Sequence, residues 1–350
     1  MSFFDDNEFL WDRLKNTDKP IVVYGTGNGA DKLFSLCERF GVTVSAIFAS
    51  DGFVRSREFR GFRVQSLSDI ERQYEDFIVL LSFAVFKDDL MQTMINISKK
   101  HEFYAPDMPL FGGGLLDRQL LTENADKIAN AYSLLADDRS RAVFENVLRY
   151  RYTGRIDHLL ACESSRDEIM SGLSLPKNPN YLDLGAYDGD TVREFIARYP
   201  DHGEITALEP DPKNFKKMKK DAELVRCGVE MIEAAAWCES GTLEFSAEGS
   251  RNSHAQSDGG AVRAVSVDEL LKNRRIDLIK MDVEGVESEV LSGMKNTACK
   301  WSPALIVSAY HKTNDLFELI EKVAKLLPER KIYLRHHRYI PAWETNIYAF

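Results

Sequence analysis

The sequence predicts an α/β protein that has two Rossmann-like parallel sheets with a helical connector between them. Two units indicate this architecture, since each is a short buried strand that breaks at glycines and continues as an amphipathic helix; they begin near residues 21 and 181. Further apolar strands alternate with helical patterns, which favours right-handed crossovers and parallel sheets covered by helices. The 350 residues fit two domains, because a domain usually takes roughly 100–200 residues.

The first unit occupies residues 18–105. Strand Ile21–Tyr24 is short and apolar and ends at the glycine-rich turn Gly25–Ala30. Apolar residues then recur at the spacing of a helix face: Leu33, Leu36, Cys37 and Phe40. Val42–Phe48 and Phe77–Ser82 predict a second and a third strand, and these elements together predict a small Rossmann-like domain.

A helical connector is predicted after the glycine run Gly112–Gly114, where apolar spacing continues to about Leu160. The segment Lys177–Asn180 contains Asn and Pro and marks the next boundary. We therefore expect a Rossmann-like, nucleotide- or sugar-binding-like domain at residues 1–110, the connector at 111–172 and a second α/β domain at 173–350.

The second unit starts with strand Tyr181–Leu184, turns at Gly185–Gly189 and enters a helix that we expect Asp190 to cap. The next strand, Ile205–Leu208, ends at Glu209. Later strands are predicted at Val229–Ala234, Ile276–Met281 and Ala304–Ser308. An antiparallel hairpin at the sheet edge is predicted from the last two apolar segments, Lys331–Arg335 and Asn346–Phe350.

Composition excludes several classes of function. The 55 acidic and 45 basic residues give a formal net charge of −10, which disfavours non-specific binding to nucleic acid or anionic lipid. The longest apolar run, Phe77–Phe86, is about half of the ~20 residues that a membrane-spanning helix needs. The five cysteines are scattered without a CxxC pair, and the N-terminus is acidic where a signal peptide is basic. We expect a cytoplasmic protein without a membrane span; a homo-oligomer is compatible with the sequence.

The glycine turn at Gly185–Gly189 predicts a cofactor site. Such a turn brings bare backbone against a ligand at the carboxyl end of a strand. Glu209 ends the next strand, 24 residues after Gly185, and can accept both hydroxyls of a ribose, so any adenosine-containing cofactor fits. Asp183, Asp188 and Asp190 make the loop acidic, which favours the cationic S-adenosylmethionine over a pyrophosphate. The pattern is also GxxxG, whereas a dinucleotide site typically has GxGxxG.

A series of motifs in the same order resembles the FkbM family of methyltransferases, over about residues 173–350. The residues that carry this resemblance are Leu182–Asp190, Leu208–Asp211, Ala235–Trp237, Ser266–Leu270, Ile279–Gly285, Glu287 and Leu291–Gly293. The resemblance implies a class I methyltransferase fold and methyl transfer from S-adenosylmethionine to a hydroxyl oxygen, often on a sugar, glycan or polyketide. The cofactor site that we expect comprises Asp183, Gly185, Ala186, Tyr187, Asp188, Gly189, Thr191, Glu209, Pro210, Ala236, Trp237 and Asp282.

The N-terminal unit resembles a different group, the small nucleotide-sugar-binding domain that precedes some sugar acyltransferases. Gly25–Ala30, Ala46–Asp51, Gly61–Val64 and Ser66–Ile70 carry this likeness. Gly25, Gly27 and Ala30 also fit the dinucleotide pattern GxGxxG/A, with Asp51 lying 21 residues further on. We expect a nucleotide site here, at Gly25, Gly27, Asn28 and Asp51, and an NAD site remains an alternative.

Methyl transfer to an alcohol needs alignment of oxygen, carbon and sulfur, and a base that takes the proton. Asp282 and Glu284 follow one predicted strand and His311 follows the next, so we expect all three at one edge of the sheet. His311 is the predicted general base; Glu284 could instead satisfy N–H groups at a helix N-terminus. These residues could alternatively bind a divalent cation, but no further ligand spacing supports it, and we assign no metal site.

The segment 248–260 is polar and glycine-rich. It predicts either a plain surface loop or a lid over the substrate, in which Arg251 and His254 would bind hydroxyls or phosphate. The leading hypothesis is an S-adenosylmethionine-dependent O-methyltransferase whose partner is a sugar or another small molecule. Two alternatives stay open: a nucleotide-sugar or dinucleotide-binding protein with a non-catalytic methyltransferase-like half, and an NAD-dependent oxidoreductase that uses Gly25–Ala30.

Overall fold

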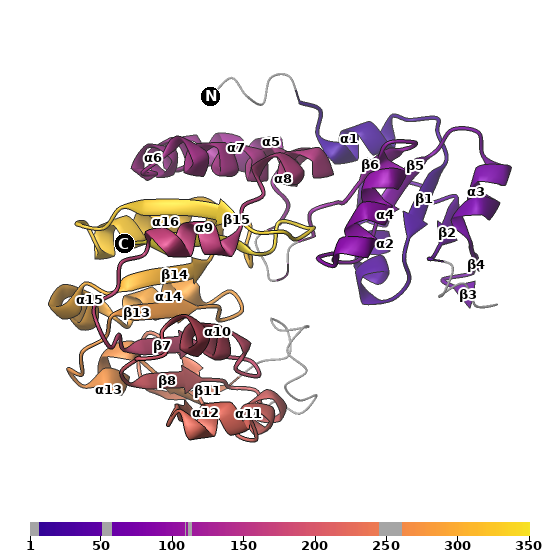
Figure 1. Ribbon diagram of the computed structural model, residues 1–350. Helices are drawn as coiled ribbons and strands as arrows, with labels where there is room; N and C mark the ends of the chain where they lie inside the picture. The colour runs from indigo at the N-terminus through magenta and orange to yellow at the C-terminus, as the bar shows by residue number, and fades with distance from the viewer. Residues whose placement is uncertain (1–6, 51–57, 109, 111–113, 245–260) are drawn as a thin grey trace.

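The computed structural model of the protein describes residues 7–50, 58–108, 110, 114–244 and 261–350. Two large sheets, of six and seven strands, lie in separate parts of the molecule and are covered by helices (Figure 1). The α/β class and the Rossmann-like arrangement predicted from the sequence are therefore confirmed. Among the residues described, no helix has both the length and the apolar character that crossing a bilayer requires.

The N-terminal sheet has the strand order β3-β4-β2-β1-β5-β6, in which only the β3–β4 pair is antiparallel. Its strands are β1 (Ile21–Tyr24), β2 (Ala46–Phe48), β3 (Glu58–Phe59), β4 (Phe62–Gln65), β5 (Ile78–Leu81) and β6 (Glu102–Tyr104). The helices of this part are α1 (Leu10–Lys15), α2 (Asn28–Phe40), α3 (Leu67–Gln73) and α4 (Asp88–Ser98). β1 has the predicted bounds, but β2 is shorter than predicted, because Val42 N–H donates instead to Cys37 O, 2.8 Å away, at the end of α2.

Helices fill the stretch between the two sheets. They are α5 (Arg118–Glu123), α6 (Ala125–Leu134), α7 (Asp138–Thr153), α8 (Ile156–Cys162) and α9 (Arg166–Gly172). α6 and α7 lie along the C-terminal segment of the chain (Figure 1). Arg335, which is buried, forms an ion pair with Asp137 at 2.7 Å and donates to Ser140 Oγ at 2.8 Å. These polar contacts fix α7 to the second sheet.

The second sheet has the strand order β15-β16-β14-β13-β7-β8-β9. Its strands are β7 (Tyr181–Leu184), β8 (Ile205–Leu208), β9 (Glu230–Ile232), β13 (Leu278–Met281), β14 (Ala304–Ser308), β15 (Ile332–His336) and β16 (Thr345–Ala349). β16 runs antiparallel to both of its neighbours, β14 and β15, so the predicted C-terminal hairpin is confirmed. The helices are α10 (Asp190–Arg198), α11 (Pro212–Met218), α12 (Ala222–Arg226), α13 (Val267–Leu271), α14 (Glu287–Ser292), α15 (Lys295–Trp301) and α16 (Asp315–Leu326).

Two details differ from the sequence prediction. Gly189, with φ of 88°, occupies the N-cap position of α10, and Asp190 is the first helical residue. A small third sheet, β10 (Ala235–Ala236), β11 (Gly241–Glu244) and β12 (Ala261–Val265), follows β9 and was not predicted. It forms because the chain turns after Ile232, whose carbonyl accepts Ala234 N–H at 3.1 Å.

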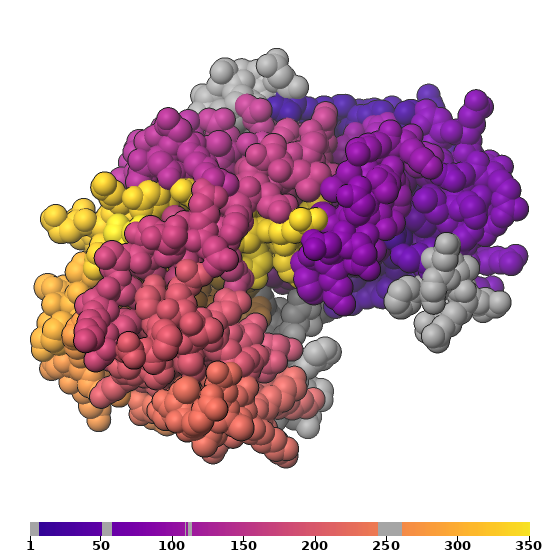
Figure 2. All heavy atoms as spheres, viewed as in Figure 1, coloured from indigo at the N-terminus to yellow at the C-terminus, as the bar shows by residue number. Residues whose placement is uncertain are grey.

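The N-terminal part is joined to the hairpin of the second sheet. Val85 and Ile340 exchange backbone hydrogen bonds of 2.7 and 2.8 Å, and the ring of Phe86 stacks on Tyr339 with centroids 5.4 Å apart. Figure 2 shows the C-terminal segment, in yellow, at the surface between the magenta helices and the purple N-terminal part. The carboxyl end of β5 therefore lies against the loop that connects β15 to β16.

Candidate active site

The carboxyl ends of four neighbouring parallel strands, β8, β7, β13 and β14, form one edge of the second sheet. Ligands of open α/β sheets bind at this edge. The segments that follow these strands contain the predicted cofactor turn, Glu209, the pair Asp282 and Glu284, and His311. The fold thus places the cofactor and catalytic residues predicted from the sequence along a single edge.

Gly185 lets the cofactor turn approach the end of β13. Its φ is 79°, and a Cβ atom at this position would lie 1.9 Å from the carbonyl oxygen of Asp282. Any side chain would force these two segments apart. The glycine therefore serves the contact between two loops of the site.

The backbone N–H groups of the turn are used inside the protein. Gly185 and Ala186 both donate to Leu208 O, at 3.0 and 2.9 Å, and Tyr187 donates to Glu209 Oε2 at 2.8 Å. A dinucleotide-binding turn instead directs such groups at the pyrophosphate. This pattern supports a cofactor without a pyrophosphate more directly than the acidity of the turn does.

Glu209 fits the role of a ribose ligand. It is buried, and its second oxygen, Oε1, accepts Asp211 N–H at 2.8 Å. Each carboxylate oxygen has two lone pairs, so each can accept one ribose hydroxyl in addition to its backbone donor. Burial raises the pKa of Glu209 to about 7, although hydrogen bonds from Asp211 and Tyr187 oppose this.

Asp183 lies beneath the turn rather than in an open pocket. It is fully buried and accepts hydrogen bonds from the hydroxyls of Tyr181, at 3.0 Å, and Thr191. Lys280 Nζ lies 3.2 Å from Asp183 Oδ1 and donates to Gly185 O at 2.8 Å. Lys280 was not among the predicted site residues, although a lysine inside a strand predicted to be buried signals a carboxylate partner.

These pairs correct the electrostatic argument made from the sequence. Lys280 balances the charge of Asp183, and Arg193 lies 3.1 Å from Asp188. Asp190 is exposed. The turn is therefore much closer to neutral than its three aspartates imply, because two of them have basic partners from β13 and α10.

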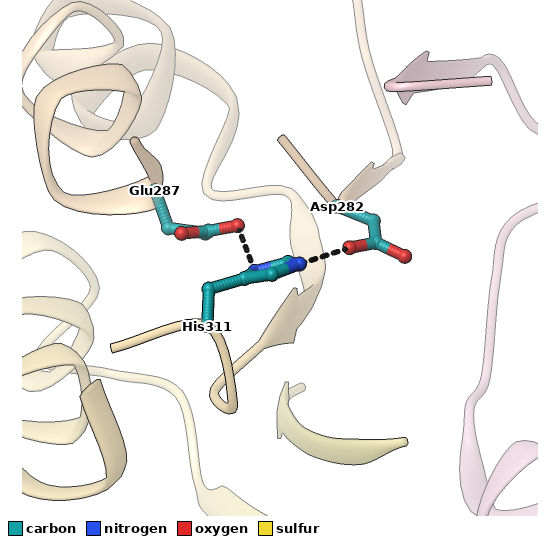
Figure 3. Close-up of side chains that lie close together, drawn as sticks. All are labelled: Asp282, Glu287 and His311. Carbon is teal, nitrogen blue, oxygen red and sulfur yellow. Dashed lines mark ion pairs between the residues drawn. The ribbon is translucent and has the colours of Figure 1, made fainter. Parts of the chain in front are cut away.

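His311 and three carboxylates form a cluster at the ends of β13 and β14, shown in part in Figure 3. The imidazole is 2% exposed, and its Nε2 lies 3.4 Å from Asp282 Oδ1 and 3.7 Å from Glu284 Oε2. On the other side of the ring, Nδ1 lies 2.9 Å from Glu287 Oε1. The three predicted catalytic residues are thus brought together, with Glu287 as a fourth member that was quoted only as part of a motif.

The charges around His311 decide its protonation. Burial lowers the pKa of the imidazole, but Glu287, Asp282 and Glu284 together raise it to about 9. The ring is therefore protonated at neutral pH when no ligand is bound. Tyr310 donates its hydroxyl to both oxygens of Asp282 at 3.1 Å, which fixes that carboxylate beside the ring.

Asp282, Glu287 and His311 offer ligand atoms within 4.8 Å of one another. The imidazole, however, lies between the two carboxylates and presents a different nitrogen to each (Figure 3). A chain of ion pairs, carboxylate to imidazole to carboxylate, accounts for the trio without a metal ion.

Comparison with known proteins agrees with this geometry. Residues 183–340 match the family model of the methyltransferase FkbM domain. This part of the chain is therefore similar to an FkbM methyltransferase domain. A crystal structure of methyltransferase FkbM from Methylobacillus flagellatus KT is similar over 97% of this chain and 92% of that chain, with a TM-score of 0.73 at 19% identity, which shows a shared fold.

Other solved structures are less similar. Precorrin-6y C5,15-methyltransferase from Geobacter metallireducens GS-15 covers 53% of this chain and 86% of that chain, at 16% identity and a TM-score of 0.34. Comparison with curated proteins gave no match. None of these matches supports the likeness of the N-terminal part to sugar acyltransferases.

The other predicted cofactor residues of the FkbM domain differ in what their side chains can reach. Ala186 is fully buried in the core, whereas Tyr187 is 53% exposed with φ of 50°. Pro210 follows Glu209 directly; Ala236 is buried on β10, and Trp237 N–H donates to Val265 O at 2.9 Å. Arg251 and His254, predicted to contact substrate, lie outside the described residues.

The N-terminal glycine turn has a packing explanation of its own. Gly25 has φ of 114°, and a Cβ atom there would lie 2.5 Å from the ring of Phe83 and 2.6 Å from Ser82 Oγ. Gly27, with φ of 120°, is the N-cap residue of α2, which begins at Asn28. Asp51 lies outside the described residues, so nucleotide binding by this turn stays a prediction.

Proposed function

We propose that this protein transfers a methyl group from S-adenosylmethionine to a hydroxyl oxygen of a sugar or glycan precursor. One observation carries the proposal: Glu209, with acceptor capacity for a ribose, and His311, faced by Asp282 and Glu284, lie along the same strand edge of an FkbM methyltransferase domain. The internal use of the turn's N–H groups supports a cofactor that lacks a pyrophosphate.

Each end of the cofactor has a suitable partner. Glu209 would hold the ribose hydroxyls, while Asp282 and Glu284 would face the positively charged end. Bound there, S-adenosylmethionine supplies a methyl group that is bonded to a positively charged sulfonium sulfur. Its positive charge suits a region where three carboxylates, Asp282, Glu284 and Glu287, surround one imidazole.

His311 would act as the general base. As the acceptor oxygen took the methyl group from the sulfonium, the hydroxyl proton would move to Nε2 of His311, which would leave S-adenosylhomocysteine and a protonated imidazole. Because His311 must be neutral to accept a proton, its pKa of about 9 predicts that transfer accelerates as the pH rises towards 9.

The remaining assignments made from the sequence extend the proposal. We propose three domains, at residues 1–110, 111–172 and 173–350, and substrate contacts for Arg251 and His254. The unpaired, scattered cysteines support a reducing compartment, and hence the cytoplasm.

Calorimetry on the full chain tests the cofactor. S-adenosylmethionine should bind and NADH should not, and Glu209→Ala should abolish binding. Asn28→Ala is the control, because Asn28 is exposed on the N-terminal turn and should leave S-adenosylmethionine binding unchanged. Binding of NADH that is lost in Asn28→Ala and kept in Glu209→Ala would favour the oxidoreductase alternative.

Transfer is tested with methyl-labelled S-adenosylmethionine and a panel of nucleotide sugars. Label should appear in a sugar product as a methyl ether, identified by mass spectrometry. A protein that binds the cofactor but labels no member of the panel would favour the non-catalytic alternative.

A further inference from the structure

We infer that Glu287 is a positioning residue, which orients His311 for proton transfer and ties it to the loop that carries Asp282 and Glu284. This inference rests on the proposed function and extends it to a residue to which the sequence analysis gave no catalytic role. Glu287 is the first residue of α14 and is 1% exposed.

A single oxygen of Glu287 lies close to three nitrogen atoms, two of which donate hydrogen bonds to it. Its Oε1 lies 2.9 Å from His311 Nδ1 and accepts the backbone N–H groups of Val283, at 3.1 Å, and Gly285, at 3.3 Å. Val283 and Gly285 flank Glu284, whose backbone has φ of 56°, unusual for a residue with a side chain. Glu287 therefore holds both the imidazole and the strained loop opposite it.

The ion pair at Nδ1 favours one nitrogen for the reaction. A neutral imidazole carries one N–H, and the negative charge of Glu287, 2.9 Å from Nδ1, stabilises it on that nitrogen. Nε2 is then the nitrogen that gains and loses the proton, and Nε2 is the one that faces Asp282 and Glu284. Carboxylates orient catalytic histidines by the same logic on unrelated folds.

Several charged groups surround the ring. Asp282 and Glu284 come from the loop after β13, Glu287 from α14, and Asp315 from α16; Tyr310 is adjacent in sequence. Of the two ion pairs that Figure 3 marks on the ring, the one with Glu287 is the shorter, at 2.9 Å against 3.4 Å for Asp282. Removal of its charge should therefore make the protonated imidazole less stable.

Glu287→Gln is the decisive variant. Glutamine keeps an oxygen for Nδ1–H, Val283 N–H and Gly285 N–H but removes the charge. The titration midpoint of His311, followed by nitrogen NMR and assigned with His311→Ala, should fall by about one pH unit or more. The limb of kcat against pH should move to lower pH by the same amount, and the plateau of kcat should fall about 10-fold or more.

Glu289→Gln is the matched control, since it makes the same chemical change two residues further along α14. Glu289→Gln should change neither the titration midpoint of His311 nor the pH dependence of kcat. A purely structural role for Glu287 would lower the melting temperature without moving either, and that result would overturn the inference. So would an unchanged midpoint in a Glu287→Gln protein that melts as the native one does.

The two readouts separate this inference from the proposed function. The NMR midpoint needs no acceptor, so a shift measured in a protein that methylates nothing would refute the proposed reaction and still show the coupling of Glu287 to His311. If Glu287→Gln transfers the methyl group and its kcat depends on pH as that of the native protein does, the positioning role is refuted and the methyltransferase activity is not.

Discussion

The affinity for S-adenosylmethionine should depend on pH through Glu209. Burial raises the pKa of this carboxyl to about 7, whereas a ribose that donates two hydroxyls to it stabilises the ionised form. Binding must therefore remove the proton wherever Glu209 is protonated in the free protein. The sign follows: affinity rises as the pH increases through 7.

The magnitude comes from the same pKa. With a midpoint of about 7, about 10% of Glu209 is ionised at pH 6 and about 90% at pH 8. The dissociation constant should accordingly be about tenfold larger at pH 6 than at pH 8, which makes the binding free energy about 1.4 kcal/mol less favourable. Loss of both hydrogen bonds in Glu209→Ala should cost more, about 3–6 kcal/mol at pH 8, because each bond to a charged acceptor contributes about 1.5–3 kcal/mol.

Isothermal titration calorimetry at pH 6, 7 and 8 measures this dependence. Glu209→Gln is the control, since it cannot ionise; any slope that it retains belongs to other groups, such as the amino group of the cofactor. Glutamine offers one oxygen to two backbone donors, so its melting temperature is measured in parallel. Equal dissociation constants at pH 6 and 8 in the native protein, or an equal slope in Glu209→Gln, would refute the reasoning.

Three further predictions concern catalysis and stability. His311→Ala should lower turnover about 100-fold or more while leaving cofactor affinity within a few-fold, measured by labelled-methyl transfer and calorimetry; unchanged turnover would remove His311 from the mechanism. Gly185→Ala should destabilise the protein and abolish cofactor binding, because the new Cβ would lie 1.9 Å from Asp282 O. Gly228→Ala is the control: Gly228 has φ of 70° and open space around it, so this variant should lower the free energy of unfolding by only about 1–2 kcal/mol. Arg335 and Ser140 hold the pKa of Asp137 at about 2 against the effect of burial. Asp137→Asn should therefore lower the melting temperature at pH 7, and the difference in melting temperature from the native protein should disappear as the pH falls towards 2. An equal difference in melting temperature at both pH values would contradict the assignment.

Strands of the sheet centres could be predicted because burial on both faces leaves a continuous apolar run. β1 and β7 have the predicted bounds, Ile21–Tyr24 and Tyr181–Leu184. Edge elements carry a weaker pattern: β9 is three residues long with partly exposed side chains, and β10 has two residues. The small sheet of β10, β12 and β11 arises from long-range pairing, which local periodicity does not encode.

The site could be predicted where it depends on topology and not where it depends on side-chain pairing. Asp282 and His311 follow strands that the pattern makes parallel, so their proximity follows from the fold. Lys280, the partner of Asp183, and Glu287, the partner of His311, could not be derived in this way. Their roles depend on the direction in which each side chain points, which the order of the strands does not determine. Each lies within five residues of a predicted site residue; Glu287 is 1% exposed, and the side chain of Lys280 is 13% exposed.

Charge balance links the two parts of the site. Lys280 neutralises Asp183 beneath the turn, and protonated His311 offsets one of the three carboxylates Asp282, Glu284 and Glu287. The end of β13 therefore retains net negative charge, which suits a sulfonium. A cation bound there also disfavours the proton on His311, so on the proposed function cofactor binding lowers the pKa of the base.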